Sequence, residues 1–247
     1  MKRALVLSVL GLLAAGCGGG TADVAQPTTE TNAAPSTMTA ATTTTGQTQS
    51  VTLFFLAQDG KLVAASRDVA RTQAPGAATL RELTAPEEGT TTSVPNGLQL
   101  TIDEGKAHVT GASLDDAALA QIVYSLTSFP TVQSVNGKTR AEVEDFAPAI
   151  LVENPSPGEA VTSPIHVTGS ANTFEATFNY RLENAQGDEL AKDFVTATSG
   201  SGTRGTFDFT VPFTVDSAQD GKLVVFELSA EDGSVIHQRE IPLRLLP

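Results

Sequence analysis

The hydrophobic positions at the start of the folded part predict two paired strands followed by a helix. Residues 51–56 form an apolar run typical of a strand, and residues 61–65 are the expected partner across a tight turn at Asp59-Gly60. Residues 77–83 have the composition of a short helix that lies between two prolines. We therefore expect a β-hairpin that is followed along the chain by a helix.

The following positions predict a second hairpin and a longer helix. Residues 98–102 and 106–110 read as two strands flanked by glycine-containing turns. Apolar side chains recur with helical spacing over residues 114–126, and Ser113 opens a pattern that resembles a capping box. A last short strand is expected at residues 132–135. Because few strands and two helices must share one core, we expect a small α+β domain with two helices on one face of a mixed sheet.

The pattern changes to strict alternation after a segment rich in proline at residues 154–158. Apolar and polar residues alternate over 174–182 and again over 207–213, which is typical of strands with one buried and one wet face. With the shorter apolar runs, about seven strands are expected, as in an all-β immunoglobulin-like sandwich. The cysteine pair and tryptophan of antibody domains are missing, so a core rich in phenylalanine must hold this sandwich together.

The amino-terminal residues predict export from the cytoplasm. A cationic start, an apolar run too short for a membrane span, and small residues before Cys17 resemble the signal peptide and lipobox of bacterial lipoproteins. This resemblance implies cleavage between Gly16 and Cys17 and a lipid on Cys17; an ordinary secretory signal is the alternative. The expected organisation is a signal peptide at 1–16, a lipidated cysteine and disordered Thr-rich linker at 17–50, the α+β domain at 51–147 and the sandwich at 148–247.

Composition narrows the classes of partner. The formal net charge of −13 gives a surface that repels nucleic acid, so a nucleic-acid partner is not expected. Solubility is the simpler explanation of the acidity. Cys17 is the only cysteine, which excludes an internal disulfide, a CxxC redox pair and a thiolate zinc site. The expected partners are a membrane, through the lipid, and other proteins of the cell envelope.

Three stretches of the first region resemble the GerM-type domain of bacterial sporulation and spore-germination lipoproteins, which also occurs in actinobacterial LpqB lipoproteins. They are residues 80–86, residues 93–97 and, most specifically, residues 121–130. Residues 161–171, 174–175 and 223–227 resemble the immunoglobulin-like domain that accompanies it in germination proteins. The resemblance implies an extracytoplasmic lipoprotein that works in cell-envelope complexes, and it provides no catalytic residues.

Candidate chemistry is sparse along the chain. Residues 200–205 spell GxGxxG but precede a strand, so a loop between strands explains them better than a dinucleotide site. His108, His166 and His237 lie far apart in expected strands, where solvent-facing positions are the simpler interpretation than metal binding or base catalysis. The acidic pairs at 87–88, 115–116 and 231–232 fit turns and helix starts without the spacing of a calcium loop. We therefore expect no catalytic residue, no metal and no cofactor.

Tyr124 and Phe129, near the end of the second expected helix, are candidates for contact with a partner, and core packing is the alternative for both. These observations together predict a membrane-anchored, non-catalytic binding or scaffold component of a cell-envelope complex, which could serve sporulation or germination. A protein that binds peptidoglycan or sugar, a wall-modifying protein, and a regulator of a membrane signalling system are the alternatives.

Overall fold

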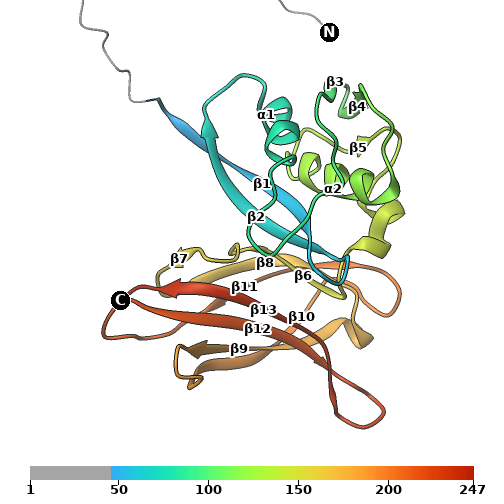
Figure 1. The fold of residues 1–247 in the computed structure, drawn as a ribbon. Coiled ribbons are helices and arrows are strands. Elements are labelled where there is room, and N and C mark those ends of the chain that lie inside the picture. The colour runs from blue at the N-terminus through green and yellow to red at the C-terminus, as the bar shows by residue number, and fades with distance from the viewer. Residues whose placement is uncertain (1–45) are drawn as a thin grey trace, which may run out of the picture. The chain divides into compact units, whose positions relative to one another are not determined.

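A computed structural model describes residues 46–247, which begin with a hairpin of two long strands, β1 (Thr48–Leu56) and β2 (Leu62–Ala70) (Figure 1). The expected turn forms at the predicted place, with Gly60 at φ +74° and the Ala57 N–H donating to the Lys61 carbonyl at 2.8 Å. Both strands extend beyond the predicted ranges, because Thr48 pairs with Ala70 at the far end of the ladder. The predicted hairpin is confirmed.

Two helices follow the predicted positions, α1 (Pro75–Glu82) and α2 (Asp116–Leu126). The start of α2 differs from the expectation at Ser113. Asp115 is the N-cap, because its extended backbone lets its carboxylate accept the N–H of Ala118 at 2.7 Å. The capping-box interpretation of Ser113 is therefore wrong, and the helix begins two residues later.

The first domain is α+β, as expected, but its strands fall into two sheets. One is β1-β2; the other is the mixed sheet β3-β4-β5, in which β3 (Gln99–Asp103) and β4 (Lys106–Thr110) are antiparallel and β5 (Ser134–Val135) is parallel to β4. The expected α+β class is confirmed. The expectation of a single sheet beneath both helices is wrong, because the strands form two separate sheets.

The reason for the division lies on α2, which carries two polar side chains with no exposed surface. The N–H of Phe54 in β1 donates to Ser125 Oγ at 3.0 Å, and the Phe54 carbonyl accepts from Gln121 Nε2 at 3.0 Å. These are backbone groups that a neighbouring strand would otherwise bind. The helix therefore takes the place of a strand beside β1.

A short 3-10 segment, η1 (Arg140–Phe146), links the two domains and was not predicted. Thr139 and Glu142 start it with a capping box, in which the Thr139 N–H donates to the Glu142 carboxylate at 2.9 Å. The sequence signal was present in the Thr-x-x-Glu spacing. It was missed because no apolar periodicity accompanies it.

The second domain is a sandwich of two sheets, as expected. The larger sheet has the order β10-β9-β12-β13-β7 and the smaller has the order β11-β8-β6. The strands are β6 (Ile150–Asn154), β7 (Ala160–Val161), β8 (Ile165–Ala171), β9 (Thr177–Asn184), β10 (Glu189–Thr196), β11 (Gly205–Val211), β12 (Gln219–Leu228) and β13 (Val235–Leu245).

Aromatic rings from facing sheets form the centre of the sandwich. Phe178 and Phe207 lie 4.9 Å apart between ring centroids, and Tyr180 and Phe209 are equally close. Such pairs add about 0.5–1.5 kcal/mol each beyond the burial of their area. The alternation predicted this interior correctly except at Phe174, which lies in the short 3-10 turn η2 (Phe174–Ala176) with 56% of its surface exposed.

The two cores meet at β6. Ile150 and Val152 contribute to the core of the sandwich, whereas Leu151 points the other way and belongs to the core of the first domain. Because alternate side chains of a strand face opposite sides, one strand supplies both cores. The described residues belong to one compact unit of the chain, which is consistent with this shared strand.

Candidate binding surfaces

The predicted lipid attachment at Cys17 and the cleavage site beside Gly16 lie outside the described residues. The same holds for the predicted signal peptide and for nearly all of the linker. Within residues 46–247, neither helix combines the length and the apolar character that a bilayer crossing requires.

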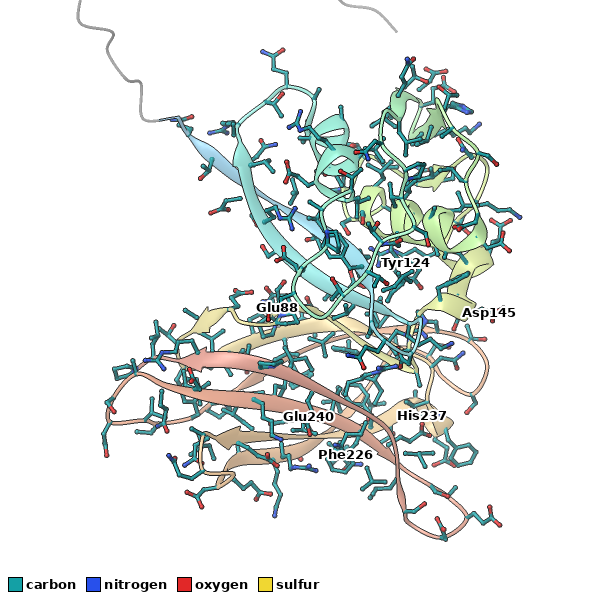
Figure 2. All side chains as sticks on the ribbon, in the orientation of Figure 1. Glu88, Tyr124, Asp145, Phe226, His237 and Glu240 are labelled. Carbon is teal, nitrogen blue, oxygen red and sulfur yellow. The ribbon has the colours of Figure 1, made fainter. Side chains whose placement is uncertain are left out.

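Tyr124 is buried in the first domain, so its assignment as a surface contact is corrected to the core-packing alternative (Figure 2). Its ring lies 5.3 Å from that of Phe54, and the guanidinium of Arg140 lies 4.6 Å from its centroid. Burial raises the pKa of the Tyr124 phenol. The side chain is placed inward because its position on α2 faces β1, whose strand carries Phe54.

Phe129 is half-buried and lines an apolar cavity of about 430 Å³ together with Gly76, Leu100 and Val132. Ile102, at the rim, is 47% exposed. The cavity is formed where the start of α1 approaches β3. Contact of Phe129 with a partner remains a prediction.

Arg140 in η1 forms one of the connections between the domains. Its Nη1 contacts Glu153 Oε1 of β6 at 2.7 Å, its Nε donates to Thr127 Oγ1 at 2.8 Å, and its Nη2 donates to the Tyr124 carbonyl at 3.0 Å. Because all three nitrogens have partners, Arg140 fixes the end of α2 to the sandwich. It is not available as a free cation for a ligand.

Arg204, in the loop between β10 and β11, makes the second connection. Its Nε contacts Glu144 Oε1 of η1 at 3.1 Å, and its Nη2 donates to the Pro148 carbonyl at 2.7 Å. The same Glu144 oxygen accepts from Asn172 Nδ2 at 3.0 Å. Since Arg204 and Glu144 are both largely buried, the contact restrains the segment that joins the domains.

A third connection involves the β1–β2 turn. Asp59 Oδ2 accepts from Arg239 Nη2 of β13 at 2.6 Å, and Lys61 Nζ donates to the Asp145 carbonyl at 2.6 Å. The pKa of Asp59 is lowered: desolvation opposes this, but the hydrogen bonds from the Lys61 backbone and from the Arg239 side chain outweigh it. Contacts at three separate places hold the domains against each other.

The glycine-rich stretch at residues 200–205 is a packed loop between two strands and forms no helix start. A side chain at Gly200 would place its Cβ 2.4 Å from the Ala176 nitrogen, and one at Gly205 would place it 2.2 Å from the Ser199 nitrogen. Glycine is required there for close approach of backbones. The interpretation as a loop, not a dinucleotide site, fits this geometry.

The three histidines lie apart and face solvent. His166 Nε2 lies 2.7 Å from Asp208 Oδ1, and His237 Nδ1 lies 2.8 Å from Glu227 Oε2 at a bulge of β13. Among the residues that the structure describes, no three side chains of His, Cys, Asp or Glu gather as metal ligands would.

One carboxylate of each acidic pair contacts the backbone or another side chain. Asp115 caps α2, Glu87 contacts Arg67, and Asp232 accepts the N–H of Ser234 at 3.0 Å. Their carboxylates are therefore engaged locally.

The edge of the larger sheet exposes an aromatic side chain that the sequence analysis did not single out. Phe194 of β10 is 64% exposed, and β10 has a strand neighbour on one side only. The Phe194 N–H donates to its neighbour's carboxylate, Asp193 Oδ1, at 2.9 Å. An edge strand with an exposed aromatic ring is a surface on which another protein can dock.

Two family models match the chain. The model described as "Sporulation and spore germination" matches residues 52–136, and the model described as "Immunoglobulin-like domain of bacterial spore germination" matches residues 149–234. No curated protein sequence matches the chain.

Two solved structures show weak similarity. The tandem GerMN domains of the sporulation protein GerM from Bacillus subtilis share 12% identity over 69% of this chain, at a TM-score of 0.31, and the match spans 64% of their length. WR4, a C. elegans MSP family member, shares 12% identity over 40% of this chain and 97% of its own length, at a TM-score of 0.23.

Proposed function

Because the chain belongs to the germination-related proteins that join a sporulation and spore germination domain to the immunoglobulin-like domain of bacterial spore germination, we propose that it is a non-catalytic binding component of a cell-envelope complex. The succession of these two domains along one chain is the observation that carries the proposal. The exposed edge of the sandwich provides the contact surface.

The connections between the domains support a role as a scaffold. Arg140 and Arg204 each join groups of both domains or of the segment between them. A binding protein gains affinity when its surfaces are held in place before the partner arrives, since less conformational freedom is lost on binding. The two domains are therefore expected to present their surfaces as a unit.

The location of this component outside the cytoplasm rests on the amino-terminal pattern. We propose that Cys17 carries the lipid and that the Thr-rich linker separates the folded part from the membrane. Metabolic labelling with a clickable fatty acid is expected to label the wild-type chain and leave Cys17→Ser unlabelled. Equal labelling of both chains would contradict the anchor.

The partner contact is proposed at β10, where Phe194 projects from the edge strand. A partner strand can add to this edge by main-chain hydrogen bonds while its own side chains pack on the ring. The Phe194 N–H would then exchange its hydrogen bond to the Asp193 carboxylate for one to the partner strand. Because both groups are exposed, this exchange costs little free energy.

The test is retrieval of partners from detergent-solubilised envelope with the full chain as bait. Phe194→Ser is expected to lose at least one protein that the wild type retrieves, with unchanged thermal unfolding because the ring is mostly exposed. Val235→Ser is the matched control, since it removes an exposed apolar side chain from β13, which two strands separate from β10. Identical sets of proteins for wild type and Phe194→Ser would overturn the proposed contact.

A further inference from the structure

A groove of about 1000 Å³, lined by several threonines, lies between the first domain and the smaller sheet of the sandwich. Thr168, Gly169 and Asp208, on the neighbouring strands β8 and β11, form part of its lining, and Thr52 of β1 and Ser128 line it from the first domain. Figure 1 shows β6 and β8 on the side of the sandwich next to β1 and β2. Ligand sites are common at such junctions and have volumes of about 300–1,000 Å³.

Each charged side chain of the groove has a partner. Arg140 contacts Glu153 at 2.7 Å, and Asp208 contacts His166 at 2.7 Å. An anionic ligand would be repelled by the carboxylates of the groove and by the net charge of −13, and the Arg140 guanidinium already has a carboxylate partner. The groove is therefore unsuited to phosphate-rich or other strongly anionic ligands.

The hydrogen-bonding groups that remain are neutral. The hydroxyls of Thr52, Thr168 and Thr196 line the groove and have no hydrogen-bond partner among the described residues. The Gln133 amide also lines it. Each hydroxyl can donate and accept, and an amide does both through separate atoms. Such a set matches a ligand that itself carries many hydroxyls and amides.

The lining has no large aliphatic side chain. Its one aromatic residue, Phe207, is 4% exposed, so its apolar part is supplied by small groups such as Ala141 and the threonine methyls. The C–H face of a sugar ring can rest on such a surface, whereas a lipid chain would gain little there.

We propose that this groove binds an uncharged oligosaccharide rich in hydroxyl and acetamide groups. The proposal goes beyond the contact with envelope proteins, because it requires no protein partner, although Thr196 of the groove lies on β10, two residues from Phe194. In a protein that also docks at β10, the groove would connect a glycan to the same complex.

The experiment is calorimetric titration of the full chain in detergent with the β-1,4-linked tetrasaccharide of N-acetylglucosamine. Saturable binding by the wild type is expected, and Thr168→Val is expected to weaken it about fivefold, the effect of one lost neutral hydrogen bond. Valine has the shape of threonine and suits a strand, so the variant should fold. Thr210→Val, an exposed strand position outside the groove, is the matched control and should bind as the wild type does.

Absence of binding by the wild type at millimolar sugar overturns the proposal, as does equal weakening by Thr168→Val and Thr210→Val. A neutral Gly-Ser-Thr peptide is titrated in parallel; if the peptide binds and loses affinity in Thr168→Val while the sugar does not bind, the groove is a polypeptide site and the proposal is wrong. Phe194→Ser should bind the sugar normally, so failure of the protein contact and failure of the sugar site are distinguishable.

Discussion

Replacing Gln121 by methionine tests whether α2 substitutes for a strand beside β1. The Gln121 side chain is fully buried, its Nε2 donates to the Phe54 carbonyl at 3.0 Å, and its Oε1 accepts the Ser93 N–H at 2.9 Å. Methionine has nearly the same length and shape but makes neither hydrogen bond. The substitution would therefore leave a buried carbonyl of β1 and the N–H of Ser93 without these partners.

The magnitude follows mainly from the Phe54 carbonyl, because Phe54 is fully buried whereas Ser93 is an exposed residue. A buried backbone group that loses its hydrogen-bond partner destabilises the fold by about 1–3 kcal/mol. Replacing the buried polar amide by an apolar side chain offsets part of this loss. We expect Gln121→Met to lower the free energy of unfolding by about 2–3 kcal/mol, which corresponds to a decrease in Tm of roughly 4–12 °C for a folded part of this size.

The assay is urea unfolding of the full chain followed by far-UV circular dichroism, with a thermal scan of the same samples. Gln186→Met, in an exposed turn, is the control and should change the free energy by less than about 0.5 kcal/mol. A change of that small size in Gln121→Met as well would refute the reasoning, because the β1 edge would then not depend on the helix.

Three further predictions concern the sandwich and the junction. Gly169→Ala should destabilise the protein by about 3 kcal/mol, measured by urea unfolding, because the new Cβ would lie 2.1 Å from the Leu151 carbonyl; a neutral effect would contradict the packing. The hydrogen bond from Arg181 lowers the pKa of Glu183, so the ion pair stabilises the fold at neutral pH, and this stabilisation is lost as the pH falls below 4.5, the ordinary pKa of a glutamate. Glu183→Gln should therefore flatten the dependence of Tm on pH in that acidic range. An unchanged profile would oppose this assignment. Arg204→Met should lower the free energy of unfolding by about 2 kcal/mol and increase proteolysis between the domains, whereas unaltered proteolysis would argue against the connection to Glu144.

Local patterns predicted most elements because strands, turns and helices depend on neighbours in sequence. The Asp59-Gly60 turn and the alternation around Phe178 required no knowledge of distant residues. The same rules misjudged Ser113 and Phe174. In both cases the local structure depends on which carboxylate accepts a particular backbone N–H. Asp115 accepts that of Ala118, and Glu227 accepts that of Phe174.

The candidate surfaces could be predicted less well, because exposure is decided by what packs against a residue. Tyr124 and Phe194 are both aromatic residues within regular elements, and nothing adjacent to them in the chain distinguishes their fates. The first is covered by β1 and Arg140, whereas the second lies on a strand whose free side has no neighbouring strand among the described residues. Only the packing of distant segments separates them.

The sequence by itself determined the two domain classes, the hairpins, the sandwich alternation and the resemblance to germination proteins, since each is written in residues that lie close together in the chain. The tertiary structure alone decided that Gln121 and Ser125 replace a strand, that Leu151 joins the core of the first domain, and that threonines distant in sequence line one groove. The physical reason is that hydrogen bonds and buried contacts act over a few ångströms, so pairings between distant residues exist only once the domains have folded and packed together.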